Sequence, residues 1–504
     1  MILKAFLKHE ILNLLKSRRV YLTVLLFLVL FASVFVVRVM DYQRQINNYL
    51  ADVRQADEAM LNPSNYSHIN PRAIHQPAIF SIYNQGFLFN RVINIVFYDP
   101  ITSSVAYNEE RNLLFSENNK LDITFLITFF LSLFTLLISY DSVNGEKQTG
   151  TLRILLTFPI KRQSFILKKI LGIFIFVAIA FTIPYTLSLI CLMLIYANLL
   201  TSFFFLSAFF YWFLVILFIF FFSLLGILLS VSTVYPSRSL VYCLLTWMLL
   251  CIVLPTSWNY IISPKLFDDR IDQLIQIYDD KLAEANTIYN KPPQEINFFS
   301  GKFVRISYRQ SAEFEISCFQ GEYEHFYLFL KYIYDTYYPA SREVEHAIDN
   351  VIRMRINIEK TKSRVFFFNP IVLFNGISND ISGNSRSDYL EFLNKGRAIR
   401  ENLVNTGFRD GWLFNYGFLA LTADENLLGK REDFDFRNFG KIDTIIADAE
   451  PFTFDMPIIM RYDQPNPTFG EIFSRIAVVL TIFVASILAL WILTWYRFMK
   501  FDVR

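Results

Sequence analysis

The sequence predicts a polytopic α-helical membrane protein with six transmembrane helices and a mainly helical (α+β) extracytoplasmic domain. Hydrophobic residues make up 54% of the 504 residues, and charged residues make up only 18%. The charged share of soluble domains is roughly 25%. The apolar residues gather in runs of about 20 or more, the length that crosses a hydrocarbon core of about 30 Å. Lys and Arg collect in alternate segments between these runs, which is the pattern of a multi-pass chain.

Six runs are long enough to span a membrane, and the fifth is the shortest of them. The third and fourth exceed the minimum length, so these helices have room to tilt. The six runs cover residues 20–37, 121–140, 165–196, 203–230, 240–255 and 476–495.

The distribution of positive charge predicts that both termini are cytoplasmic, because cytoplasmic loops are enriched in Lys and Arg. Four basic segments fall on one side of the membrane if the chain has six spans. They contain Lys4 and Arg19 near the N-terminus, Lys161 and Arg162 after the second span, Arg238 after the fourth, and Arg497 near the C-terminus.

The spans divide the chain into six expected parts. Residues 1–19 repeat apolar residues at helical spacing against lysines, which predicts an amphipathic interfacial helix, although an ordinary cytoplasmic anchor explains the segment equally well. The other parts are the first transmembrane helix (20–40), an extracytoplasmic loop (41–120), transmembrane helices two to five (121–256, including a cytoplasmic coupling segment at 141–165), the extracytoplasmic domain (257–471), and the sixth transmembrane helix with a cytoplasmic tail (472–504).

The extracytoplasmic domain reads as largely helical. Residues 266–289 and 343–362 carry apolar side chains at helical spacing opposite charged ones. A third helix is expected at 387–404, after a break rich in Gly, Asn and Ser at 376–385. Between 407 and 465, frequent Pro, Gly, Asn and Asp predict strands and loops.

The chain lacks the motifs of an energy-converting enzyme. It has no GxxxxGK[ST] phosphate-binding loop, which argues against nucleotide hydrolysis by this chain. Its spans carry no charged residue near their centres, in contrast to ion-coupled transporters, although sodium sites built from carbonyls and hydroxyls would escape this test. We expect no catalytic residue and no metal site, because the five histidines form no metal-binding pattern. The net charge of +2 gives no reason to expect nucleic-acid binding.

Any energy input must therefore come from a partner at the cytoplasmic surface, and one polar segment there stands out. Residues 141–169, between the second and third spans, read DSVNGEKQTGTLRILLTFPIKRQSFILKK. The segment resembles the pattern D-x-x-x-G-E-x-x-x-G-T-L-x-x-L-L-x-x-P-I-x-R of type-2 ABC exporter permeases. In that family the segment forms a coupling helix that docks on a separate ATPase subunit. The resemblance implies a coupling role for Asp141, Gly145, Glu146, Gly150, Thr151, Leu152, Leu155 and Pro159.

Each residue type suits that role. Gly145 and Gly150 permit sharp turns around a short helix. Glu146 can pair with a basic group of the ATPase, and Thr151 can cap the next helix. Leu152 and Leu155 are the expected apolar anchors, and Pro159 is expected to end the helix.

A second stretch, FFFNPIVLFNGISNDISG within 366–403, is similar to the pattern N/S-P-x-x-L-F-x-x-I-S of a bacterial subgroup of these permeases. That subgroup has a large extracytoplasmic domain between the fifth and sixth helices. Permeases linked to copper-site maturation and to gliding machinery are close to it, and the pattern identifies no cargo.

The resemblance implies an exporter subunit in the bacterial inner membrane. Its expected partners are two ABC ATPase copies, a second permease (identical or related), the lipid bilayer and a periplasmic protein. No cofactor is expected in this chain, since ATP and Mg²⁺ would bind the ATPase. The alternative is a membrane-anchored receptor or assembly scaffold, whose outer domain binds a periplasmic partner without transport. Co-purification of a nucleotide-binding subunit would separate the two hypotheses.

Overall fold

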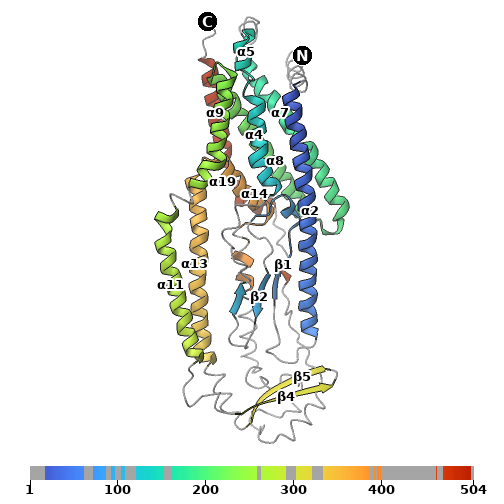
Figure 1. Ribbon diagram of the computed structural model, residues 1–504, viewed down its shortest axis with the longest axis vertical. Coiled ribbons are helices and arrows are strands. Elements are labelled where there is room, and N and C mark those ends of the chain that lie inside the picture. Colours follow the sequence, from blue (N-terminus) through green and yellow to red (C-terminus); the bar gives the residue numbers. More distant parts are fainter. Residues whose placement is uncertain are drawn as a thin grey trace.

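The computed structural model confirms a polytopic helical protein with six helices long and apolar enough to span a membrane (Figure 1). It describes residues 17–61, 72–86, 92–96, 104–107, 121–152, 162–257, 263–290, 302–310, 312–320, 333–385, 388, 390–392, 394–396, 398, 461–462 and 469–500. The six candidate spans are Val20–Arg54, Ile123–Gln148, Arg162–Ile195, Ser202–Ser232, Pro236–Ser257 and Gly470–Met499.

Six groups of elements form these spans. Pro184 lies inside the third of them without ending the helix. In chain order the elements are α2 (Arg18–Leu61), then α3 (Ile123–Leu126), η4 (Ile127–Leu131), α4 (Ser132–Ser139) and α5 (Asn144–Gln148), then α7 (Arg162–Ile195), α8 (Ser202–Ser232), α9 (Pro236–Met248) with η6 (Leu249–Val253) and α10 (Leu254–Ser257), and finally α19 (Phe469–Met499).

Helix α8 is the centre of the bundle and packs against α4, α7, α9 and α19. It has the largest buried share of the six spans, 72% of its most apolar window. Its contact with α4 is close at Gly226, where an added Cβ would overlap the Ser139 side chain. Phenylalanines fill much of the remaining space, as where the Phe218 ring lies 4.8 Å from that of Phe222. The Phe-rich composition of this run is therefore the core of the bundle.

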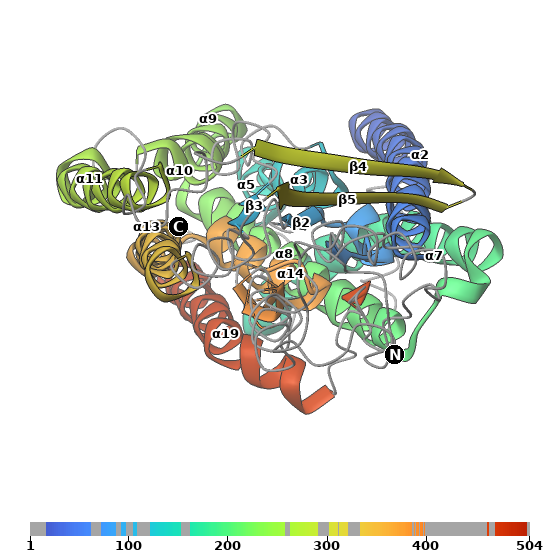
Figure 2. The same ribbon diagram turned by 90° about the horizontal axis from the view of Figure 1, so that it is seen from below.

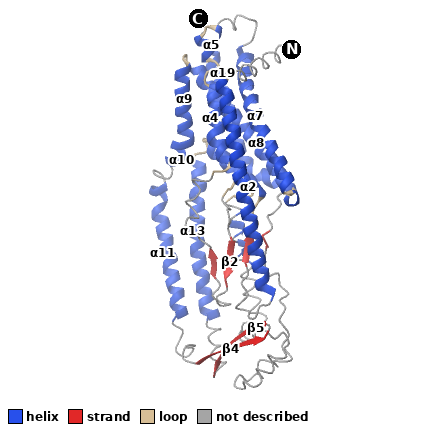
Figure 3. Ribbon diagram, turned by 45° about the vertical axis from the view of Figure 1, so that its right-hand side comes forward, coloured by secondary structure: helices blue, strands red, loops and turns tan. Residues whose placement is uncertain are grey.

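The elements beyond the bundle come from several parts of the predicted division. Helix α2 continues to Leu61, so it runs from the expected first transmembrane helix into the segment 41–120. The loop after it contributes β1 (Arg72–His75), β2 (Val92–Val96) and β3 (Ser104–Tyr107), and β1 pairs in parallel with β6 (Arg461–Tyr462). The segment 41–120 and the domain 257–471 thus share one sheet, in the order β3-β2-β1-β6. Figure 3 shows these strands beyond the membrane helices, on the side away from α5.

Two of the predicted outer helices are confirmed and form an antiparallel hairpin. They are α11 (Ser263–Asn290) and α13 (Tyr338–Val365), preceded by η10 (Ile333–Tyr337). Lys281 joins them through an ion pair to Glu343 (2.6 Å), and this pairing raises the pKa of Lys281 and lowers that of Glu343. Figure 2 shows the hairpin on the opposite side of the molecule from α2 and α7. The strands β4 (Lys302–Gln310) and β5 (Ala312–Gln320), between its two helices in the chain, form a separate antiparallel ribbon.

The break predicted at 376–385 begins too early. Helix α14 (Pro370–Ser382) continues through Gly376 and ends at Gly383, whose φ of 67° is the left-handed conformation that glycine adopts readily. The prediction failed because the helix is capped by Asn369 and packs Phe374 and Ile377 into the core, which outweighs the poor helix propensity of Gly376. The third predicted helix, 387–404, and the strands expected over 407–465 lie mostly outside the described residues, as does most of the amphipathic helix predicted at 1–19.

Asn369 explains why α14 begins where it does. Its side-chain oxygen accepts a hydrogen bond from the Ile371 amide (2.9 Å), and its side-chain nitrogen donates to the Leu250 carbonyl (2.9 Å). Leu250 lies in the π-helical segment η6 of the fifth span. Asn369 thus caps α14 and anchors it to the fifth span.

A polar cluster fixes the loop 76–86 to the outer ends of the spans. The Arg38 guanidinium is buried and donates to Asp41 (2.5 Å) and to the Ser81 carbonyl (3.1 Å). The Tyr83 hydroxyl lies 2.7 Å from that of Ser188 in α7. Asn84 donates to Asn379 in α14 (2.9 Å). Buried polar groups of this kind require hydrogen-bond partners, so these contacts hold the loop in one position between the spans and α14.

Candidate functional site

The candidate site is the end of the second span, where α5 follows a turn after α4. Figure 1 shows α5 at the same end of the molecule as the described start of α2 and the described end of α19. This is the arrangement expected if the four basic segments share one side of the membrane. The segment 141–152 is described, whereas 153–161, with Leu155 and Pro159, lies outside the described residues.

Helix α5 is fixed to the end of α8 by backbone and side-chain hydrogen bonds. The amides of Val143 and Asn144 both donate to the Ser230 hydroxyl, at 3.1 and 3.2 Å. The Asn144 side-chain amide donates to the Thr233 hydroxyl (3.0 Å). Asn144 and Ser230 are fully buried, so these contacts are shielded from water. They give the short α5 helix a fixed position that its five residues could not hold in isolation.

Lys147 strengthens this attachment. Its ammonium donates to the carbonyls of Val231 and Thr233, at the C-terminal end of α8. The last carbonyls of a helix have no partner within the helix and carry partial negative charge. Lys147 of α5 therefore caps the C-terminal carbonyls of α8, and this contact joins the two helices.

A second contact joins α5 to α7. Lys169 donates to the Glu146 carboxylate at 2.6 Å, and the exposed fractions of the two side chains are only 5% and 23%. The Lys169 ammonium also lies 5.9 Å from the centre of the Phe165 ring. Burial makes this pair stronger and less sensitive to salt than a surface pair. The second oxygen of Glu146, Oε2, is buried and accepts no hydrogen bond within the described part of the chain.

The chain turns sharply after α5. Gly150 has a φ of 75°, a conformation that other residues adopt at a cost. The Thr151 hydroxyl lies 2.9 Å from that of Thr149 and 3.3 Å from the Glu146 carbonyl, so it closes the turn. Leu152 follows and is 2% exposed, packed into the core of the bundle.

The structure describes most of these residues, and their roles toward an ATPase stay predictions. Glu146 forms an ion pair with Lys169 of the same chain. Leu152 is buried. Gly145 lies inside α5, and the sharp turn is at Gly150. The Thr151 hydroxyl contacts the Glu146 carbonyl, and the segment that Thr151 was expected to cap lies outside the described residues.

The surface left for a partner is polar. Within the described part of the segment, the exposed residues are Asp141, Gln148, Thr149 and Thr151. The sequence analysis also missed Asn144, Lys147, Ser230 and Thr233, which hold α5 in place. The sequence held one sign of Ser230 and Thr233: both are hydroxyl residues at the end of an apolar run, where their side chains can bond to backbone groups nearby.

At the outer end, one carboxyl group has an unusual environment. Asp380 in α14 lies near Asp388 and is partly buried. Burial, together with the negative charge of Asp388, raises its pKa to about 6. Arg475, which donates to Asp388 at 2.9 Å, offsets part of this effect. Among the described residues, no group of His, Cys, Asp and Glu could hold a metal ion.

Two relatives share a short stretch of this sequence. The probable ABC transporter permease protein NosY of Pseudomonas aeruginosa is 41% identical over 63 residues, which is 12% of this chain and 23% of the relative. The protein of the same name from Stutzerimonas stutzeri is 36% identical over 70 residues, which is 14% of this chain and 25% of the relative. The chain thus matches about a quarter of the length of each of these relatives.

A family model matches far more of the chain. The model, described as "ABC-2 family transporter protein", covers residues 5–503. It therefore includes all six spans, the α5 segment and the outer elements between the fifth and sixth spans. This match confirms the resemblance carried by the motif after the second span: the chain belongs to the ABC-2 family of transporter proteins.

Proposed function

We propose that this chain is the membrane-spanning permease subunit of an ATP-driven ABC exporter. A separate ATPase subunit would hydrolyse ATP and push on the segment 141–165. The segment would then shift the transmembrane helices, either to export a substrate or to move the outer domain. The membership of an ABC permease family supports a partnership with an ABC ATPase.

One observation carries this proposal: α5 is bonded to two spans at once. Lys147 holds the C-terminal end of α8, and Glu146 holds Lys169 of α7. A force on α5 would therefore act on both helices together. A cytoplasmic loop without a mechanical role would not need a buried ion pair, whose assembly requires desolvating both charges.

The proposed contact surface for the ATPase is the exposed tip of α5. Gln148, Thr149 and Thr151 project from the bundle at this end. The enrichment in Lys and Arg assigns the same end to the cytoplasm, where ATP is available. Because Glu146 is paired with Lys169 in the same chain, we expect the ATPase to contact the uncharged side chains of the tip and not the Glu146 carboxylate.

The proposed assembly contains two permease and two ATPase subunits. One permease chain supplies one coupling segment, so a dimeric ATPase calls for a second permease, identical or related. The fifth span is only 11% buried over its most apolar window, which supports a helix that packs against another permease. ATP and Mg²⁺ would bind the ATPase, and the outer domain would meet a periplasmic partner. The proposed location is the bacterial inner membrane.

Site-directed photo-crosslinking tests the contact with the ATPase. We would introduce a photoreactive amino acid at position 149, on the exposed tip, and co-express the full chain with its ABC ATPase. We expect a covalent adduct with the ATPase that mass spectrometry identifies. The matched control carries the same amino acid at exposed position 287 in α11 and should give no such adduct.

The competing hypothesis, a receptor or scaffold without transport, makes the opposite prediction. It requires no ATPase contact at α5. An absent adduct at position 149, with no ATPase retained in the purified complex, would therefore refute the permease assignment.

A further inference from the structure

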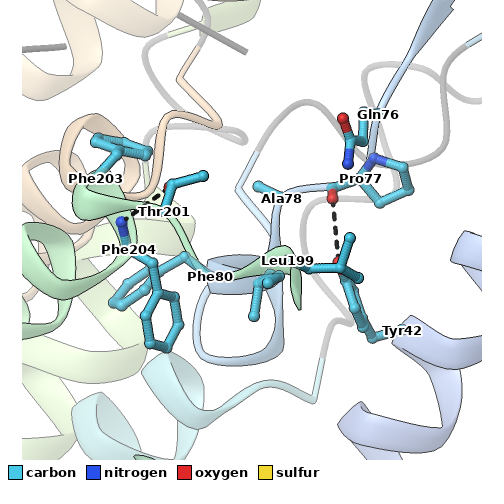
Figure 4. A pocket seen from close by; sticks show the side chains of 10 residues that line it. Tyr42, Gln76, Pro77, Ala78, Phe80, Leu199, Thr201, Phe203 and Phe204 are labelled. Carbon is cyan, nitrogen blue, oxygen red and sulfur yellow. Dashed lines mark hydrogen bonds between the residues drawn. The ribbon is translucent and has the colours of Figure 1, made fainter. Parts of the chain in front are cut away.

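A pocket of about 290 Å³ lies at the outer end of the bundle, far from α5 (Figure 4). Three parts of the chain meet around it: α2, the loop 76–78 with the following η2 (Ile79–Ile82), and the turn between α7 and α8, which contains η5 (Ala197–Leu199), with the first residues of α8. Its lining comprises Tyr42, Gln76, Pro77, Ala78, Ile79, Phe80, Leu199, Thr201, Phe203 and Phe204.

The aromatic walls of the pocket are held firmly in place. Tyr42, Phe80 and Phe204 are each at most 3% exposed. The Phe80 ring lies 6.2 Å from that of Phe204 and 5.4 Å from that of Tyr211 deeper in the bundle. The Tyr42 hydroxyl donates to the Pro77 carbonyl at 3.4 Å. Side chains packed in this way form the pocket before any ligand arrives, so binding costs little reorganisation.

The polar groups of the lining carry no full charge. Gln76 contributes an amide and Thr201 a hydroxyl, while the ten lining residues include no Asp, Glu, Lys, Arg or His. A charged ligand would lose its hydration here without gaining a counter-ion. A neutral group that donates or accepts hydrogen bonds would keep its partners. The lining therefore selects an uncharged ligand with both apolar and polar parts.

The surroundings of the pocket indicate the source of such a ligand. Met40 of α2 is 69% exposed and Leu194 of α7 is 80% exposed, both within a few residues of the lining. Exposed apolar side chains of this kind on spanning helices can contact lipid. Tyr42 and Tyr196, whose rings meet edge to face at 5.3 Å, are of the type that gathers where a bilayer meets water. The pocket thus borders the bilayer surface.

The volume limits the size of the ligand. A water molecule occupies roughly 30 Å³ of liquid, so the pocket holds about ten times that volume. This is enough for a small polar group and the first carbons of one chain, and too little for both tails of a phospholipid.

We propose that this pocket binds the neutral polar end of an uncharged amphipathic lipid, of the class of long-chain alcohols and acylglycerols. The hydroxyl of the lipid would bond near Gln76 and Thr201, and its first methylene groups would pack against Phe80, Phe203 and Phe204. This site is separate from the ATPase-coupling segment and does not depend on the exporter assignment.

Photolabelling of the full chain in phosphatidylcholine nanodiscs tests the proposal. The probe is a long-chain alcohol with a diazirine near its hydroxyl, and the matched probe is the corresponding carboxylic acid. We expect the alcohol to label peptides 76–80 and 199–204. The acid should label them about tenfold less, which corresponds to 1.4 kcal/mol of lost affinity. An excess of unlabelled long-chain alcohol should suppress the labelling.

Two variants separate the pocket from the surrounding lipid. Leu199→Trp places a larger side chain in the pocket and should reduce labelling by the alcohol about tenfold. Leu194→Trp changes a lipid-facing residue nearby and should leave labelling unchanged. Equal labelling by the acid, no competition by unlabelled alcohol in the unmodified chain, or full labelling of a folded Leu199→Trp variant would each overturn the proposal.

Discussion

At the scale of single residues, the inner end of the protein is organised by charges that satisfy one another. Lys147 completes the carbonyl end of α8, and Lys169 neutralises Glu146. Lys169 is 4% exposed, so its ion pair with the Glu146 carboxylate is largely shielded from water. Replacing either member of the pair would remove this contact between α5 and α7. The motif residue Glu146 therefore contributes to the fold as well as to the proposed coupling.

Asp380 gives a prediction for the pH dependence of stability. Its pKa is about 6 in the folded protein and 3.8 in the unfolded chain, so folding favours the protonated form. The resulting stabilisation is complete below pH 3.8 and is lost as pH rises through 6. It amounts to at most about 3 kcal/mol. Asp380→Asn should remove this contribution, which thermal unfolding in detergent between pH 4.5 and 7.5 would measure.

The control for this prediction is Asp279→Asn, on the exposed face of α11. Its pH profile should match that of the unmodified protein. If Asp380→Asn and the unmodified protein lose stability in parallel between pH 4.5 and 7.5, Asp380 does not titrate as described.

At this scale, the sequence motif singles out Glu146 and Leu152 but does not predict what they contact. The structure pairs Glu146 with Lys169 and packs Leu152 into the core of the bundle. However, a sequence cannot show that Lys169, 23 residues later, returns to the same point as Glu146. It also cannot show that the turn at Gly150 directs Leu152 into the core. Both facts depend on how the second and third spans pack.

At the scale of elements, the membrane helices were predictable and the outer elements only partly so. Apolar runs of sufficient length determine the spans independently of their neighbours. The hairpin of α11 and α13 followed from helical periodicity. The pairing of β1 with β6 did not, because it joins residues 74 and 461, and each strand is too short to give a pattern. Helix α14 was misread as a break because its Gly and Asn residues are unfavourable in isolated helices.

Asn369 provides a prediction at this scale. It is fully buried, caps α14 and donates to the Leu250 carbonyl in η6. Asn369→Ala should remove both hydrogen bonds and lower the free energy of unfolding by about 2 kcal/mol. Asn375→Ala changes an exposed Asn of the same helix and should have little effect. Thermal unfolding of the two purified variants gives the comparison, and equal midpoints would contradict the role given to Asn369.

At the scale of the whole molecule, α8 connects the inner site with the outer domain. Its C-terminal end holds α5 through Ser230 and Lys147. Near its other end, the Ser207 hydroxyl donates to the Ile381 carbonyl of α14 at 2.9 Å. The Tyr211 hydroxyl lies 3.0 Å from that of Thr124 in α3. A displacement of α8 by α5 would therefore reach α14 directly. Under the proposed function, this chain of contacts would link ATP hydrolysis by the partner ATPase to the outer domain.

If α5 passes force to the spans through its two contacts, breaking one contact should change the movement of the outer elements, which a distance measurement can detect. Spin labels at exposed positions 48 in α2 and 287 in α11 report the separation of the two outer arms. The measurement compares the complete complex with its ATPase before and after trapping with ATP and vanadate. Variants are Lys169→Met, which breaks the pair with Glu146, and Lys281→Met, a control in the outer hairpin.

We predict that trapping changes the distance in the unmodified complex and in the Lys281→Met control. Lys169→Met should bind the ATPase and hydrolyse ATP, but its distance should change far less. The charge-swapped pair Glu146→Lys with Lys169→Glu should recover part of the change, because the ion pair is restored in reverse. A full distance change in Lys169→Met would contradict the account, since force would then reach the outer domain without this contact.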